Sequence, residues 1–250
     1  MAILHEYHCP TSLAEALRLV DAPDRRRQLL AGGTTLVGAL ETRARRDVDG
    51  VIDLRKLGLD TIRPEDGTIR IGAMTTLTAL VDHPATRELA GGLLPRAARG
   101  EGPINLRNQA TVGGVIATAA YDSELYAALL ALEAEVVIHG RGGDVRRPLA
   151  DLGPIDGIIT DVRVPRRNGR SGLARVARTP SDRPIVAAVA VLDDAGARTA
   201  LCGVAAHPVL DGTPLDPPDD VRGSAEYRLA VVEIVRERAG SEAREMEELP

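Results

Sequence analysis

Hydrophobic and polar positions follow two alternating periods over the first fifty residues. After the Thr11-Ser12 pair, which is typical of a helix N-terminus, apolar side chains recur at helical spacing. These positions are Leu13, Ala16, Leu17 and Val20. Residues 28–31 predict a short strand that runs into two glycines, residues 36–40 return to helical spacing, and residues 51–54 predict a second strand. The alternation predicts a small α/β unit over residues 1–56.

From about residue 58 the spacing of apolar positions changes to mostly two. An Asp66-Gly67 pair, typical of a tight hairpin turn, separates two such stretches. Asp122 or Ser123 caps a strongly apolar helix. The expected strands are residues 61–63, 68–71, 135–139, 144–149 and 158–164. Three helices are expected: one that starts at Thr75 or Thr76, one over residues 93–98, and the apolar helix at the Asp122-Ser123 cap, which follows a Gly-rich loop. Residues 57–165 therefore predict a second unit, of the α+β type.

The remaining chain predicts a third, smaller α+β unit over residues 172–240. Residues 166–172 are basic and contain glycine, so we interpret them as a linker. Residues 241–250 are acidic and are expected to form a frayed tail. The expected elements are strands 185–192 and 198–204 joined by a turn at 193–196, a Pro-rich crossing over 208–218 and a helix over 226–238.

The side-chain composition removes several classes of function. The chain has no Phe, no Trp and four Tyr residues, and its formal charge is −5, so neither a base-stacking platform nor a basic nucleic-acid surface is expected. Lys56 is the only lysine, which excludes a Walker lysine and leaves almost no Schiff-base candidate. Cys9 and Cys202 are too few for a structural zinc site or an iron–sulfur cluster, which take about four such ligands. Any metal redox centre is therefore expected on another chain.

No stretch of the sequence has the length of a membrane helix. The longest uninterrupted apolar run, residues 185–192, is far below the ~18 residues that such a helix needs. The first residues lack the basic and apolar regions of a secretion signal. We expect a cytoplasmic protein whose partners include neither membrane nor nucleic acid.

Two glycine pairs in apolar surroundings are the first candidate sites. Ala31–Leu36 lies between a predicted strand and a predicted helix, where unpaired backbone N–H groups and the helix dipole favour an anion such as phosphate. Leu106–Val115 contains the second pair, at which glycine lets a backbone approach a ligand and Thr111 offers a hydroxyl. Each pair, taken alone, is also explained by a tight turn, and the first lacks the spacing of a dinucleotide fingerprint.

A third candidate lies at the start of the apolar helix, in Tyr121–Glu124. Capping and dipole compensation suffice to explain Asp122. Glu124 has a second interpretation, as a hydrogen-bond acceptor for ribose or ribityl hydroxyls. The five histidines are spread over separate units and form no metal set, and no serine stands in a nucleophile elbow, so hydrolase chemistry has no support.

In order along nearly the whole chain, these motifs resemble the FAD-binding (medium) subunits of the xanthine dehydrogenase and carbon monoxide dehydrogenase family of molybdenum hydroxylases. The first glycine loop is similar to that family's Ala-Gly-Gly-Thr-Asp/Ser-Leu, and the second to its Ile-Arg-Asn-x-Ala-Thr-Ile-Gly-Gly. The other matching segments are the strand Val51–Leu54, Gly67–Thr76 (Ile-Gly-Ala-x-Thr-Thr), Leu129–Ala134 (Leu-Leu-Ala-Leu-x-Ala) and Arg178–Asp182 (Arg-x-x-x-Asp).

The resemblance implies an α+β fold and a cofactor. The fold is a two-subdomain PCMH-type FAD-binding domain, the type shared with vanillyl-alcohol oxidase and peptidoglycan-precursor reductase, followed by a small C-terminal α+β domain with an antiparallel sheet and helices. The cofactor is non-covalent FAD, whose diphosphate both glycine loops bind through backbone N–H groups. The residues expected at the diphosphate and ribityl chain are Ala31, Gly32, Gly33, Thr34, Thr35, Thr111, Gly113 and Gly114. Those expected near the flavin are Leu30, Leu36 and Ala117. Two further residues of the expected site are Val115, at the end of the second loop, and Glu124, where the family usually has Asp.

The resemblance also implies a function and partners. The chain is expected to relay electrons from iron–sulfur clusters of a partner, through FAD, to NAD or another acceptor, beside a molybdenum-cofactor large subunit and a 2Fe–2S small subunit, with no catalytic residue of its own. Val115 stands where the family's second loop has Asn or Ser, and Arg183 where an apolar flavin neighbour is common. These departures favour an alternative, a structural subunit of the same kind of complex with weakened or lost FAD binding.

Overall fold

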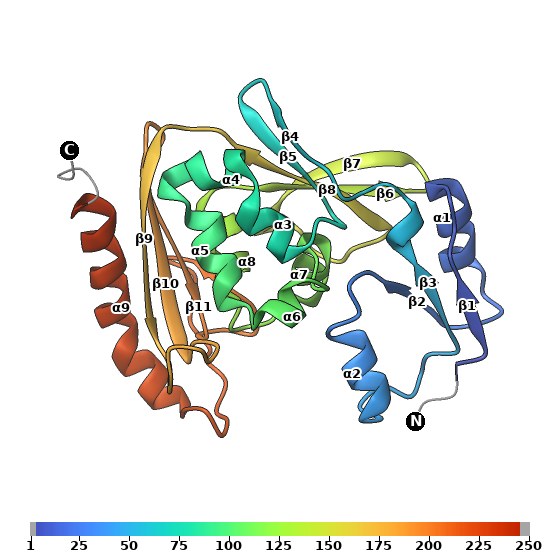
Figure 1. Cartoon of the computed structure of the whole chain (residues 1–250). Helices are drawn as coiled ribbons and strands as arrows, with labels where there is room; N and C mark the ends of the chain where they lie inside the picture. The colour runs from blue at the N-terminus through green and yellow to red at the C-terminus, as the bar shows by residue number, and fades with distance from the viewer. Residues whose placement is uncertain (1–3, 246–250) are drawn as a thin grey trace.

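The computed structural model describes residues 4–245 and contains three sheets that follow one another along the chain (Figure 1). The first sheet has parallel strands in the order β1-β3-β2. Ser12 caps the first helix, as expected, by accepting a hydrogen bond from the Glu15 N–H at 3.2 Å. The elements of this unit are β1 (Glu6–His8), α1 (Leu13–Asp21), β2 (Arg27–Leu30), α2 (Leu36–Glu41), β3 (Gly50–Asp53) and the 3-10 turn η1 (Leu54–Lys56).

The second sheet is antiparallel, with the strand order β4-β5-β8-β6-β7. Its hairpin at Asp66-Gly67 and the hairpin between β6 and β7 lie where the sequence predicts them. The strands are β4 (Ile62–Glu65), β5 (Thr68–Gly72), β6 (Glu135–Gly140), β7 (Gly143–Pro148) and β8 (Ile158–Pro165). The helices are α3 (Leu77–Asp82), α4 (Pro84–Glu88), η2 (Leu89–Gly91), α5 (Leu93–Gly100), α6 (Ile104–Arg107), α7 (Val112–Thr118), α8 (Glu124–Ala131) and η3 (Leu149–Asp151).

The third sheet is also antiparallel, in the order β12-β11-β10-β9, and it is covered on both faces. Helix α9 packs on one face and α8 on the other (Figure 1). Along β10, alternate side chains such as Val189 join the core of the middle unit, and those between them, such as Val186, pack with α9. This two-sided burial explains the uninterrupted apolar run of the strand. The elements are β9 (Gly169–Val176), β10 (Val186–Asp193), β11 (Gly196–Cys202), β12 (Val209–Leu210) and α9 (Ala225–Glu245).

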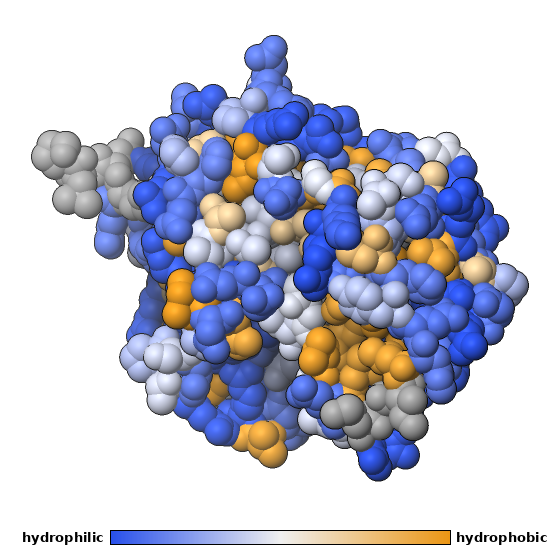
Figure 2. Space-filling model, turned by 45° about the vertical axis from the view of Figure 1, so that its right-hand side comes forward, coloured by the Kyte–Doolittle hydropathy of each residue, from blue (hydrophilic) through white to orange (hydrophobic). Residues whose placement is uncertain are grey.

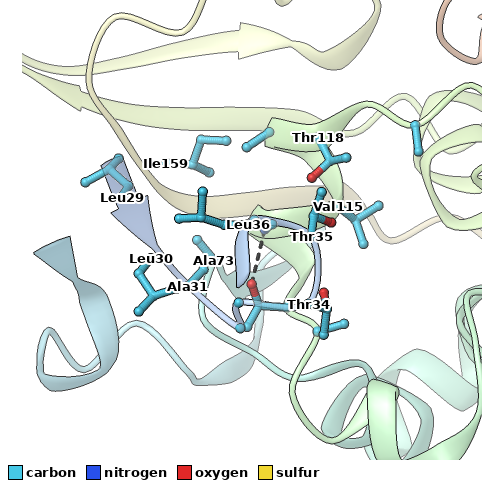
Figure 3. Close-up of a pocket in the computed structure, with 18 of the residues that line it drawn as sticks. Leu29, Leu30, Ala31, Thr34, Thr35, Leu36, Ala73, Val115, Thr118 and Ile159 are labelled. Atoms are coloured by element: carbon cyan, nitrogen blue, oxygen red, sulfur yellow. Dashed lines mark hydrogen bonds between the residues drawn. The ribbon is translucent and has the colours of Figure 1, made fainter. Parts of the chain in front are cut away.

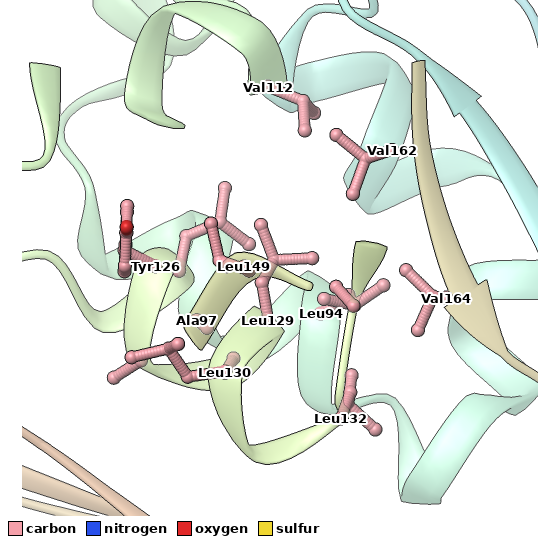
Figure 4. Close-up of a cluster of buried hydrophobic side chains, with 14 of the residues drawn as sticks. Leu94, Ala97, Val112, Tyr126, Leu129, Leu130, Leu132, Leu149, Val162 and Val164 are labelled. Carbon is pink, nitrogen blue, oxygen red and sulfur yellow. The ribbon is translucent and has the colours of Figure 1, made fainter. Parts of the chain in front are cut away.

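The main hydrophobic core lies between the second and third sheets and is built almost entirely from aliphatic side chains, since the chain has no Phe or Trp (Figure 4). All residues of α8 are buried, because this helix lies between α5 and the third sheet. Tyr126 is the aromatic member of the cluster, and burial raises the pKa of its phenol. The core therefore binds the C-terminal unit firmly to the middle one.

Two expectations at the third sheet are wrong. Residues 169–172, predicted as part of a linker, begin β9, and a β-carbon on Gly172 would lie 1.9 Å from the Ala239 carbonyl oxygen of α9. That glycine therefore permits close packing of helix on strand. Residues 241–245, predicted as part of a frayed tail, continue α9, where Glu242 accepts a hydrogen bond from the Leu173 N–H at 3.0 Å. Residues 246–250 of that predicted tail lie outside the described residues.

The predicted Gly-rich loop before α8 is also wrong in part, because it contains the short helices α6 and α7. Glycines lower helix propensity, and α7 contains the Gly113-Gly114 pair. Tertiary packing overrides this preference at Gly113, where a β-carbon would lie 2.7 Å from the β-carbon of Ala73. The helix forms where only glycine can approach the turn after β5.

Residues 4–245 contain neither a membrane-spanning helix nor a group of side chains suited to a metal ion. No helix there is both long and apolar enough to cross a bilayer. No three His, Cys, Asp or Glu side chains in this part of the chain are grouped to hold a metal ion. On the face in Figure 2, hydrophobic side chains gather in separate patches among hydrophilic ones.

Candidate cofactor-binding site

A cavity of about 620 Å³ lies where the three units meet. This volume falls within the range of about 300–1,000 Å³ that is typical of small-molecule and cofactor sites. Both glycine loops line it, and Arg183 reaches it from the third unit. Of the residues predicted to bind a cofactor, those on the cavity wall are Leu30, Ala31, Gly32, Gly33, Thr34, Thr35, Leu36, Thr111, Gly113, Gly114, Val115 and Ala117. Glu124 is not among them.

The first glycine loop joins β2 to α2 and touches the second loop. A β-carbon on Gly32 would lie 1.8 Å from the Gln109 carbonyl oxygen, so only glycine permits this approach. Gly33 has φ +75°, a conformation that favours glycine. The turn explanation is therefore correct for Gly33, whereas Gly32 serves the contact between the two loops.

Backbone donors of the first loop remain available to a ligand. The N–H groups of Gly32 and Thr34 have no hydrogen-bond partner among residues 4–245. Thr35 precedes α2 but makes no side-chain capping bond, and its hydroxyl has no hydrogen-bond partner among the residues that the structure describes. Helix α2 has six residues, so the local N–H groups rather than a long helix dipole would hold an anion here.

The second glycine loop differs, because the N–H groups of both its glycines are already used. The Gly113 N–H donates to the Ala73 carbonyl at 2.8 Å, and the Gly114 N–H donates to the Thr111 Oγ1 at 3.1 Å. The Val115 N–H donates to the Thr111 carbonyl at 3.0 Å. The expectation of free N–H groups is thus wrong for Gly113 and Gly114. Thr111 still offers two donors: its hydroxyl, which accepts from Gly114 and keeps its own proton to donate, and its N–H, which has no hydrogen-bond partner in the described part of the chain.

Much of the remaining wall is apolar (Figure 3). Leu30 and Leu36 flank the first loop, and Ile159 lies on β8 across from them. Val115 faces the same space from the first turn of α7, and its side chain offers no hydrogen bond. A flat apolar group bound among these side chains would be shielded from water.

An ion pair between Glu101 and Arg183 forms one charged part of the wall, and Arg45 forms another. Glu101 also accepts hydrogen bonds from the Ser123 hydroxyl at 2.6 Å and from the Leu125 N–H at 3.0 Å. Burial raises the pKa of the Glu101 carboxyl, and Arg183 opposes that shift. The sequence interpretation did not include Glu101, because an isolated Glu between glycines carries no local signal for burial.

Glu124 lies behind this wall. Its side chain is 2 % exposed, its carboxylate lies against the Cα of Gly100, and its Oε1 pairs with the Arg175 Nε at 3.2 Å. Burial raises the pKa of Glu124 to about 7. Glu124 thus joins the middle unit to the third sheet. Ser123, rather than Asp122, caps α8 by accepting from the Tyr126 N–H at 3.1 Å.

These features define an α+β protein with a glycine-lined cleft suited to an extended, partly anionic cofactor. The family model described as "FAD binding domain in molybdopterin dehydrogenase" matches residues 3–167. The chain belongs to this family. The family and the cofactor class that the sequence indicates are thereby confirmed.

Relatives and solved structures extend the match beyond that domain. The uncharacterized protein YgfM of Escherichia coli K12 is 31 % identical over 93 % of this chain and 94 % of its own length. The 6-hydroxypseudooxynicotine dehydrogenase complex subunit alpha of Paenarthrobacter nicotinovorans is 30 % identical over 95 % of this chain and 94 % of its own. A chain of carbon monoxide dehydrogenase from Hydrogenophaga pseudoflava superposes with a TM-score of 0.88 at 26 % identity, covering 98 % of both chains. The expected α+β fold with a C-terminal unit is confirmed.

Proposed function

We propose that this chain is the FAD-binding subunit of a molybdenum hydroxylase-type dehydrogenase and relays electrons from iron–sulfur clusters of a partner, through FAD, to NAD or another acceptor. The observation that carries the proposal is the cavity itself, whose lining combines residues with free N–H groups, Gly32 and Thr34, with a largely apolar wall. A diphosphate needs such donors, and a flavin ring needs such a wall.

Each part of the cavity has a task in this proposal. The first loop binds the diphosphate through the N–H groups of Gly32 and Thr34, and the hydroxyls of Thr35 and Thr111 add donors. Leu30, Leu36 and Ala117 line the cavity beside the ring and exclude water, and Val115 lines it at the end of the second loop. FAD supplies the redox chemistry when bound, because it carries two electrons and exchanges them with one-electron partners. Glu124 is left out of this set, because it does not line the cavity.

The partners follow from the same proposal. The described part of the chain has no grouped metal ligands, so the electrons enter from centres carried by other chains. One relative is named as a subunit of a dehydrogenase complex. We therefore propose a molybdenum-cofactor large subunit and a 2Fe–2S small subunit as partners. A cytoplasmic location stays a prediction from the sequence.

An absorbance spectrum of the purified full chain tests the proposal. The chain is incubated with FAD, free FAD is removed by gel filtration, and folding is checked by circular dichroism. We expect the bands of oxidised flavin to elute with the protein. A folded chain that stays colourless would contradict the proposal.

A second candidate function is a structural subunit of the same kind of complex that has lost tight FAD binding. Two observations favour it: Val115 offers no side-chain hydrogen bond, and the N–H groups of Gly113 and Gly114 are already bonded within the protein. The colourless result would favour this candidate, whereas retained flavin would exclude it.

A further inference from the structure

Arg183 is the residue through which the third unit reaches the cavity, and it is held in place from several sides. Its guanidinium pairs with Glu101, and its Nη1 lies 3.2 Å from Asp122 Oδ1. Its backbone carbonyl accepts a hydrogen bond from Arg222, which also pairs with Asp122 at 2.5 Å. A side chain fixed by this many contacts presents its charge at a constant position.

The guanidinium is more accessible than its partners. The Arg183 side chain is 33 % exposed, whereas those of Glu101 and Asp122 are 7 % and 8 % exposed. The two carboxylates are therefore more deeply buried than the cation, although Glu101 also lines the cavity. The Arg183 Nε finds no hydrogen-bond partner in the described part of the chain. This nitrogen is itself shielded from solvent, so a bound molecule would approach the exposed remainder of the side chain.

Arg45, on the N-terminal side of the cavity, is held less firmly than Arg183. It donates to Gln28 Oε1 at 3.2 Å, and its side chain is 42 % exposed. Its carboxylate partner, Asp47, lies 3.6 Å away on the surface. The cavity therefore has a loosely held arginine on the N-terminal unit and a firmly held arginine on the C-terminal unit, with the glycine loops also lining it.

We infer that Arg183 contacts the flavin ring of bound FAD and favours its reduced form. This inference rests on the proposed function. Reduction of FAD at neutral pH adds two electrons and one proton, so the ring gains one negative charge. A fixed cation beside the ring lowers the free energy of that form. Glu101, the carboxylate that pairs with Arg183 on the wall, raises the free energy of the reduced form.

The test measures the midpoint potential of FAD on the full chain, by titration with dithionite in the presence of reference dyes. We expect Arg183→Gln to weaken binding of reduced FAD about tenfold more than binding of oxidised FAD. For a two-electron couple that difference lowers the potential by about 30 mV. Glu101→Gln leaves Arg183 with Asp122 as its one remaining carboxylate partner among the described residues and is expected to raise the potential. A general loss of structure would not shift the two variants in opposite directions.

Arg222→Gln is the matched control. It removes an arginine from the same carboxylate, Asp122, but Arg222 does not line the cavity. Because Arg222 also donates to the Arg183 carbonyl, we expect this variant to shift the potential less than Arg183→Gln does. Equal shifts in Arg183→Gln and Arg222→Gln would overturn the inference, because the effect would then come from the cluster as a whole.

Two further variants test the inference in case Arg183→Gln does not fold. Arg183→Gln leaves a buried carboxylate without its partner, whereas the double variant Glu101→Gln/Arg183→Gln leaves no unpaired charge. Arg183→Lys keeps the charge and is expected to retain most of the wild-type potential. If the potential of bound FAD falls as far in Arg183→Lys as in Arg183→Gln, the inference of a charge effect is wrong.

ADP and riboflavin identify which end of FAD meets Arg183. The inference expects Arg183→Gln to leave ADP affinity unchanged and to weaken riboflavin binding. A loss of ADP affinity with an unchanged potential would place Arg183 at the adenylate end and overturn the inference. If the wild-type chain holds no FAD, the proposed function itself fails; if it holds FAD and its potential is insensitive to Arg183 and Glu101, only this inference fails.

Discussion

Gly32 faces the backbone of Gln109 so closely that a β-carbon on residue 32 would lie 1.8 Å from the Gln109 carbonyl oxygen. The two glycine loops are about eighty residues apart in the chain, and this contact brings them together at one cavity. Space at a glycine, rather than a hydrogen bond, thus sets the separation of the two loops.

Gly32→Ala is therefore expected to push the loops apart and lower FAD affinity at least tenfold. FAD titration followed by flavin fluorescence measures this. Gly38→Ala is the matched control, because a β-carbon there meets nothing within 4 Å. Since Gly38 lies in α2, its replacement is expected to keep FAD affinity and to stabilise the chain by about 0.5–1 kcal/mol. Equal FAD affinity in the two variants would contradict this account of Gly32.

Val115→Asn is expected to strengthen FAD binding. The side chain at residue 115 lies on the cavity wall in the first turn of α7, and an amide there can donate to the cofactor. A hydrogen bond to a charged group contributes about 1.5–3 kcal/mol, which corresponds to about a ten- to hundredfold gain in affinity. Val115→Leu, which offers no hydrogen bond, serves as the control in the same titration. No gain with Asn would show that residue 115 does not reach a polar part of FAD.

Glu124 is expected to make stability depend on pH. Burial raises its pKa in the folded chain from 4.5 to about 7, so the folded state binds the proton more tightly than the unfolded state. The resulting stabilisation is complete below about pH 4.5 and is lost as pH rises through about 7. The loss is at most about 3.5 kcal/mol, from about 1.4 kcal/mol per unit of pKa.

The measurement compares urea unfolding of the wild type and Glu124→Gln between pH 5 and pH 8. Because Gln does not titrate, the difference between the two free energies of unfolding isolates Glu124. The wild type is expected to lose stability relative to the variant as pH rises. Parallel curves would mean that Arg175 holds the carboxylate charged throughout this range.

Arg228 is expected to be essential for the stability of the third unit. Its side chain is fully buried and donates to the carbonyls of Ile185 and Gly203 and, at 2.8 Å, to Asp220. Arg228→Leu removes these donors and is expected to cost about 3–5 kcal/mol in urea unfolding. The control is Arg236→Leu, since Arg236 pairs with Asp211 near the surface, where such a pair contributes about 0–1 kcal/mol. Similar losses in both variants would contradict the assigned role of Arg228.

Local patterns were sufficient to predict most elements and the wall of the cavity. The Asp66-Gly67 turn, the cap of α1 and the two glycine loops depend on residues that are neighbours in the chain. Spacing and turn chemistry report such relationships directly. The order of several family motifs added the cofactor class, which neither glycine loop indicated alone.

Contacts between distant residues decided the rest. Gly172 was interpreted as linker because nothing near it in sequence reveals that α9 packs on β9. For the same reason the sequence did not reveal that the Gly113 N–H is bonded to Ala73 or that Glu124 is buried against Gly100. The sequence by itself determined most helices and strands, but not α6, α7 or β9. Only the tertiary structure decided which donors stay free and that Arg183 and Glu101 face the cavity, because burial and pairing arise when segments far apart in the chain pack together.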